Sequence, residues 1–154
     1  MERNFEFYMK LALLQAQQGS KRGEIPIGAI VVDQDGVIIG EGHNLVETKQ
    51  TQTAHAEMQA LTQAAQKKGD WRLQNCTLYS SLEPCAMCMS AAILSRIRCV
   101  VFAATSPIFG YRVDKGIGFT LYNCPIEIHE GILASEASAL LRTFFEGCRR
   151  SNCD

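Results

Sequence analysis

Four side chains in two short motifs could hold a metal ion and move a proton beside it. His55 and Glu57 lie two residues apart in TAHAE, and Cys85 and Cys88 lie three apart in PCAMC. One imidazole and two thiolates are ligands that suit zinc. Three protein ligands leave one coordination position open, which is typical of catalytic zinc. We therefore expect Zn²⁺ on His55, Cys85 and Cys88, with Glu57 handling a proton without being a ligand.

Both motifs are placed where a helix is expected to begin. Thr53 is predicted to cap a helix over residues 54–66, which puts the first motif in its opening turn. Pro84 fits the start of a second helix, where its missing N–H costs nothing. The two cysteines share one face of that helix. A thiolate at a helix N-terminus also has a lowered pKa, which favours metal binding.

The remaining pattern predicts an α/β fold. Apolar periodicity and turn signals predict helices over residues 5–18 and 134–145, and strands over residues 29–32, 37–42, 76–80, 98–103 and 126–129. We predict loops over residues 47–52 and 105–120. This order of elements implies a mixed central sheet with helices on both faces. Both motif helices follow a strand or loop, so the metal is expected at one edge of the sheet.

Composition narrows the class of protein. A chain of 154 residues that is 47% hydrophobic and 20% charged is expected to form a single domain, residues 1–154. A net charge of −1 gives no global basic field for nucleic acid. Seven cysteines without a disulfide framework indicate a reducing compartment, so we expect a cytoplasmic protein. No apolar run is long enough to predict a membrane partner.

The chain resembles the cytidine deaminase superfamily, and within it the bacterial tRNA adenosine deaminases. H-x-E followed by P-C-x-x-C is the signature of zinc nucleobase deaminases. The similarity covers nearly the whole chain, through EIPIGAIVV, IIGEGHN, TAHAEMQAL, TLYSSLEPCAMC, SRIRCVVFAA and EGILASEASALLRTFF. The resemblance implies a three-layer α/β/α sandwich, a homodimer, and hydrolytic removal of an exocyclic amino group from a nucleobase ring.

The resemblance also implies roles for individual residues. Glu57 is the expected proton shuttle. Asn44 and the backbone N–H of Ala56 are the expected substrate contacts, because they match the family positions that hold the ring. Phe109 lies in a loop over the crevice and is expected either to stack on the base or to close the core.

The departures from the family pattern lie in substrate-facing segments. Members of the family that act on tRNA carry a short loop K-x-G-A-x-G-S, which is replaced here by a longer segment at residues 106–122. They usually have Asp-Pro before Thr-Ala-His, where this chain has Thr51-Gln52. The C-terminal tail of this chain is also less basic. None of these changes touches the zinc chemistry. They favour, narrowly, a free base or nucleoside such as cytosine, guanine or adenine as the substrate.

Three alternatives stay open. The substrate could be a tRNA wobble adenosine, which is converted to inosine, with phosphate contacts from Arg112, Lys115, Arg142, Arg149 and Arg150; the simpler interpretation of these side chains is a solvated face. The chain could be a catalytically idle zinc module that binds RNA or a partner, although such a module does not require Glu57. A structural or redox role for C-x-x-C is the least favoured, because both motifs must then coincide by chance.

Overall fold

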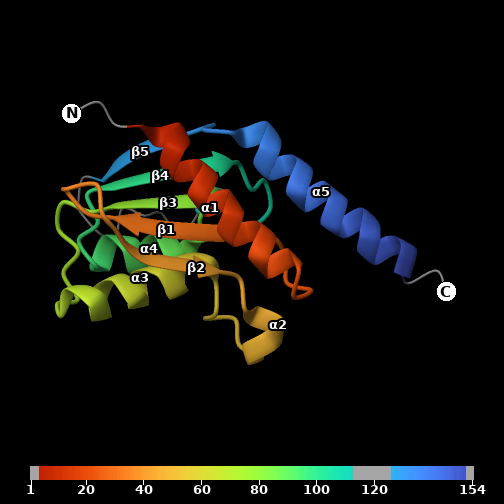
Figure 1. The fold of residues 1–154 in the computed structure, drawn as a ribbon, viewed down its shortest axis with the longest axis horizontal. Helices are drawn as coiled ribbons and strands as arrows, with labels where there is room; N and C mark the ends of the chain where they lie inside the picture. Colours follow the sequence, from red (N-terminus) through yellow and green to blue (C-terminus); the bar gives the residue numbers. More distant parts are fainter. Residues whose placement is uncertain (1–3, 113–125, 152–154) are drawn as a thin grey trace.

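In the part of the chain that the structure describes, five strands form one mixed sheet that is covered by helices on both faces (Figure 1). The computed structural model describes residues 4–112 and 126–151. In chain order the elements are α1 (Phe5–Ser20), β1 (Gly28–Val32), β2 (Ile38–His43), α2 (Val46–Lys49), α3 (Ala56–Lys68), β3 (Thr77–Leu82), α4 (Ala86–Leu94), β4 (Cys99–Ala104), β5 (Glu127–Glu130) and α5 (Ala134–Ser151).

The order of strands in the sheet is β2-β1-β3-β4-β5. Strand β1 runs antiparallel to both β2 and β3, whereas β3, β4 and β5 are parallel to one another. Helices α1 and α5 lie on one face, and α3 and α4 lie on the other (Figure 1). The predicted three-layer α/β/α architecture with a mixed sheet is confirmed.

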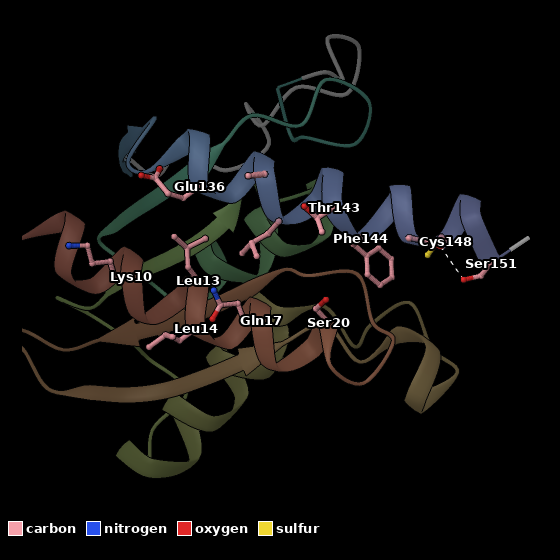
Figure 2. A pocket seen from close by; sticks show the side chains of 13 residues that line it. Lys10, Leu13, Leu14, Gln17, Ser20, Glu136, Thr143, Phe144, Cys148 and Ser151 are labelled. Atoms are coloured by element: carbon pink, nitrogen blue, oxygen red, sulfur yellow. Dashed lines mark hydrogen bonds between the residues drawn. The ribbon is translucent and has the colours of Figure 1, made fainter.

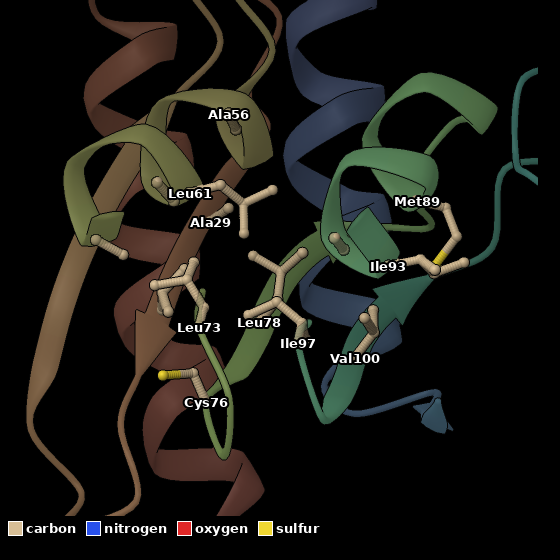
Figure 3. Close-up of a cluster of buried hydrophobic side chains, with 14 of the residues drawn as sticks. Ala29, Ala56, Leu61, Leu73, Cys76, Leu78, Met89, Ile93, Ile97 and Val100 are labelled. Atoms are coloured by element: carbon tan, nitrogen blue, oxygen red, sulfur yellow. The ribbon is translucent and has the colours of Figure 1, made fainter. Parts of the chain in front are cut away.

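Each face of the sheet has its own hydrophobic core. Ala29 and Val31 pack under α3 and α4 (Figure 3), whereas Ile30 and Val32 pack under α1 and α5. All five residues of β1 are buried, since successive side chains of a strand point to opposite faces and both faces are covered. The sheet is therefore a rigid support for the loops at its edges.

Two local features fix the N-terminal part of the sheet. Asp33 accepts hydrogen bonds from the backbone N–H groups of Asp35 and Val37, both at 2.9 Å, and Gly36 has φ of 81°. This is the predicted turn between β1 and β2. Gly28 lies so close to α1 that a Cβ there would collide with the carbonyl oxygen of Ala12, so only glycine lets the helix approach.

Two elements differ most from the sequence prediction. Helix α2 occupies part of the predicted loop 47–52, and α5 continues to Ser151 instead of ending at residue 145. The far half of α5 extends past the sheet (Figure 1), and a groove of about 1100 Å³ separates it from α1 (Figure 2). Among the described residues, no helix combines the length and apolar character needed to cross a membrane.

Candidate active site

The two sequence motifs meet at the N-termini of α3 and α4. His55 occupies the N-cap position of α3 with φ −68° and ψ 153°, and Cys85 occupies that of α4 with φ −71° and ψ 172°. The predicted cap at Thr53 is wrong by two residues, because its hydroxyl lies 3.0 Å from that of Thr51 and helix α3 begins at Ala56. Extended backbone at both caps turns the His55 and Cys85 side chains toward each other.

The three predicted ligands converge with spacing that fits zinc. His55 Nδ1 lies 3.6 Å from Cys85 Sγ and 3.5 Å from Cys88 Sγ. A tetrahedral ion with ordinary Zn–N and Zn–S bonds separates its ligand atoms by about 3.5 Å. All three ligand atoms lie within 4.8 Å of one another. The residues present therefore fit zinc, which would supply the Lewis acidity that makes water a nucleophile near neutral pH.

The thiol chemistry of the cluster favours a cation. The hydrogen bond with Cys88 outweighs the effect of burial and, together with that from His55, lowers the pKa of Cys85 to about 4. The position of Cys85 at the positive end of α4 acts in the same direction. The cluster therefore carries a thiolate at neutral pH, which is the form that binds metal.

Glu57 is buried beside the three ligands without belonging to them. Its side chain belongs to the first turn of α3, the residue is only 4% exposed, and the hydroxyl of Ser80 lies 3.1 Å from its Oε1. Burial raises the pKa of this carboxyl group. A buried carboxyl with a raised pKa, next to a metal site, is suited to accept and return a proton.

A pocket of about 760 Å³ opens over this cluster. Its walls include Asn44 from the end of β2, Ala56 from the start of α3, and Phe109 from the segment after β4. Asn44 is only 5% exposed, whereas Phe109 is 77% exposed and stands at the rim. Because Ala56 is the first residue of α3, its N–H lies outside the intrahelical hydrogen bonds. Of the sequence-predicted site residues, all but the buried Cys88 therefore line one cavity.

Glu24, which belongs to neither sequence motif, binds the segment of the pocket wall that contains Asn44. The Glu24 carboxylate is fully buried and accepts hydrogen bonds from the backbone N–H and hydroxyl of Thr48, both at 2.7 Å, and from the N–H of Glu47 at 3.2 Å. Asn44 Nδ2 lies 3.5 Å from the same carboxylate. Burial opposes ionisation of Glu24, but the bonds from Thr48 and Glu47 outweigh it and lower its pKa. This contact turns the Asn44 carbonyl oxygen away from Glu24.

Glu24→Gln is expected to lower kcat/KM by about tenfold or more, mainly through KM, because an amide cannot accept all of these hydrogen bonds and lets Asn44 turn. Zinc content should not change, because Glu24 is not a ligand. Glu41→Gln, which alters an exposed carboxylate on β2, is the matched control. Steady-state kinetics on both variants measure the effect, and an unchanged KM in Glu24→Gln would contradict this positioning role.

Glu83, which the sequence motifs also do not mark, connects the segment after β4 to the metal site through an ion pair. Glu83 is 4% exposed and lies two residues before Cys85. Its Oε1 forms an ion pair with the Arg112 guanidinium at an N–O distance of 2.8 Å. Arg112 also pairs with Glu130 at 2.5 Å. These two pairings neutralise the charge of Arg112 and so disfavour the alternative in which this side chain contacts phosphates. Lys115 and most of the predicted loop 106–122 lie outside the described residues.

Comparison with known proteins assigns the family. Residues 2–104 match the model of the cytidine and deoxycytidylate deaminase zinc-binding region. The chain belongs to this family. It is 41% identical over 150 residues to a tRNA-specific adenosine deaminase of Bacillus subtilis, with 94% of this chain and 91% of the relative covered. It is 43% identical over 143 residues to the corresponding protein of Haemophilus influenzae, with 92% and 83% covered.

Solved structures agree with this assignment. A structure from a study of tRNA:A34 deaminases has a TM-score of 0.80 and 34% identity, and the match covers 88% of this chain and 99% of that one. A guanine deaminase of Nitrosomonas europaea has a TM-score of 0.82 and 28% identity, with 94% and 85% covered. The protein is therefore a zinc-dependent deaminase of nucleobase rings, which confirms the predicted reaction and cofactor.

Proposed function

We propose that this deaminase acts on adenosine within tRNA and produces inosine at the wobble position. The observation that carries the proposal is identity above 40% across more than nine tenths of the chain to relatives named tRNA-specific adenosine deaminases. This proposal differs from the free base or nucleoside that the sequence narrowly favours because residues 106–122 depart from the family pattern.

The residues that the sequence motifs single out have distinct roles in this reaction. Glu57 accepts a proton from the attacking water and delivers it to the departing ammonia. His55, Cys85 and Cys88 hold zinc. The carbonyl oxygen of Asn44 and the N–H of Ala56 hold the ring. Because Asn44 and Glu57 are buried, the base must leave its stack to reach them. Phe109 at the rim offers a surface on which this base or a neighbouring one can stack.

Helix α5 supports an RNA substrate. Leu141 and Phe145 line the pocket, and Arg149 follows on the same helix face, four residues beyond Phe145. Arg149 therefore lies on the face of α5 that turns toward the pocket. Arg142 and Arg150 are also exposed on this helix. Phosphate contacts from these side chains would add the affinity that a single base in the pocket does not provide.

A free purine such as guanine is the second candidate substrate. The likeness to the guanine deaminase of Nitrosomonas europaea favours it, as does the pairing of Arg112 with two carboxylates, which removes one cation from the RNA-facing set. The Glu57 chemistry is the same for both substrates, so only the pocket rim and α5 distinguish them.

Ammonia release distinguishes the two candidates. Zinc-loaded protein is assayed on free bases, on nucleosides and on an anticodon stem-loop with adenosine at the wobble position. Turnover of the stem-loop, with KM rising steeply as salt increases, supports the proposal. Turnover of a free base alone, insensitive to salt, would replace it with the second candidate. Zinc binding without turnover of any substrate would instead favour the idle module.

We also propose that the protein is a cytoplasmic homodimer. Helix α4 is apolar nearly all round, yet Leu94 is 51% exposed and Ala86 is also exposed. Such a helix is normally covered on all sides, and a second copy of the chain is the partner that the family resemblance implies. The free thiols of Cys76 and Cys148 suit a reducing compartment. Light scattering on zinc-loaded protein measures the oligomeric state.

A further inference from the structure

Three side chains with metal-binding atoms also gather at the opposite end of β4 from the active site. Cys99 is the first residue of β4 and pairs in register with Glu127 of β5, and His129 lies two residues further along β5. Alternate residues of a strand point to the same face, so Glu127 and His129 project together. The thiol, carboxylate and imidazole ligand atoms lie within 4.8 Å of one another.

The surroundings of this cluster suit an ion that enters from solvent. Cys99 is completely buried under α1, whereas the side chains of Glu127 and His129 are 40% and 36% exposed. The ring centroid of Phe5, at the start of α1, lies 4.6 Å from that of His129, so Phe5 covers one side of the cluster. The sulfur therefore forms the floor of the cluster, and the carboxylate and imidazole form its open rim.

Zinc binds cysteine sulfur, histidine nitrogen and glutamate oxygen, so this donor set suits zinc. His129 Nε2 lies 2.6 Å from Glu127 Oε1, as a hydrogen-bonded pair. A tetrahedral ion requires about 3.5 Å between ligand atoms. A small rotation of the exposed Glu127 side chain provides this separation without moving either strand.

We propose that Cys99, Glu127 and His129 bind a second zinc ion, with water at the fourth position. The ion would fasten β5 to β4. Strand β5 is at the end of the sheet order, three of its four residues are exposed, and it leads directly into α5. Because α5 carries Leu141 and Phe145 to the active-site pocket, the second zinc would stabilise the helix that forms part of the pocket wall.

Metal analysis of the full chain tests this proposal. Wild-type protein equilibrated with buffered free zinc should hold about two ions per chain. His129→Gln, Cys99→Ala and the double variant should each hold one ion, because the ligands of the active-site zinc are untouched. Cys88→Ala should also hold one. Cys76→Ala removes another buried thiol and is the matched control that keeps both ions. A single zinc in the wild-type protein at micromolar free zinc would overturn the proposal.

Cobalt substitution gives a second readout that does not depend on activity. In a background that carries both Cys85→Ala and Cys88→Ala, and so has no thiolate left in the active site, Co²⁺ should produce a thiolate charge-transfer band that comes from Cys99 and disappears in Cys99→Ala. If Cys99→Ala does not fold, His129→Gln in the same background decides, because that side chain is partly exposed and its loss leaves the core intact. Cobalt binding that is equal with and without His129 would contradict the assignment.

Discussion

Glu57→Gln is expected to lower kcat by at least about a hundredfold while the protein still binds zinc, because a positioned general acid and base contributes about 10²–10⁴ to the rate. Glutamine has nearly the shape of glutamate and can still contact the Ser80 hydroxyl at the same position. It cannot accept a proton from water or return one to ammonia. The measurement is kcat for ammonia release, together with zinc content.

Stability separates this catalytic role from a structural one. Burial raises the pKa of Glu57. At a pH above the ordinary pKa of glutamate, the buried carboxylate therefore lowers the free energy of unfolding compared with a neutral side chain. The substituted glutamine side chain carries no such charge, and the free energy of unfolding of the metal-free variant should stay equal or rise. Loss of activity with an unchanged or higher Tm identifies Glu57 as the proton shuttle. Full activity in zinc-loaded Glu57→Gln would remove this role.

Cys88→Ala is expected to abolish measurable turnover by removing zinc from the active site. Cys88 is completely buried in the first turn of α4, and its sulfur lies 3.5 Å from His55 Nδ1. The variant leaves two protein ligands, and even loss of a group that only supports a ligand weakens metal binding by about 10–100-fold. Zinc content should fall by one ion per chain, and added zinc should not restore activity.

Cys76→Ala controls for the loss of a buried thiol. Cys76 is 2% exposed and packs in the core below α3 and α4, outside the metal cluster. This variant should lose some stability, as any truncation in a core does, and keep its zinc and its kcat. If Cys76→Ala and Cys88→Ala lost activity equally, packing rather than metal binding would explain both results.

The two motifs that form the candidate metal cluster could be identified from sequence because the spacing within each motif is local. His55 and Glu57, like Cys85 and Cys88, are fixed relative to each other by the helix start that carries them. The sheet with helices on both faces also followed from local hydrophobic patterns. Helix boundaries were less accurate: Thr53 has the side chain of a cap, but its hydroxyl interacts with Thr51 instead.

The contacts that support the site could not be predicted from sequence. Glu24 and Glu83 each stand beside apolar residues and a proline, which signals an unusual burial, but their partners are distant in the chain. Glu24 is bound by Thr48, and Glu83 by Arg112. The pairing of β1 with β2 brings Glu24 to Thr48, and the pairing of β3 with β4 brings Glu83 to Arg112. The same reason explains why the pairing of Arg112 was missed, since an arginine in a loop looks solvated in sequence.

The most direct test of hydrolytic deamination at this site is a reaction in heavy-oxygen water. Zinc-loaded protein is incubated with the anticodon stem-loop, and the digested nucleosides are analysed by mass spectrometry. We expect inosine that contains one heavy oxygen, with one ammonia released for each inosine, and at least about a hundredfold slower formation of both products with Glu57→Gln. Unlabelled inosine, or equal product from the Glu57→Gln variant, would contradict an attack by water that Glu57 directs.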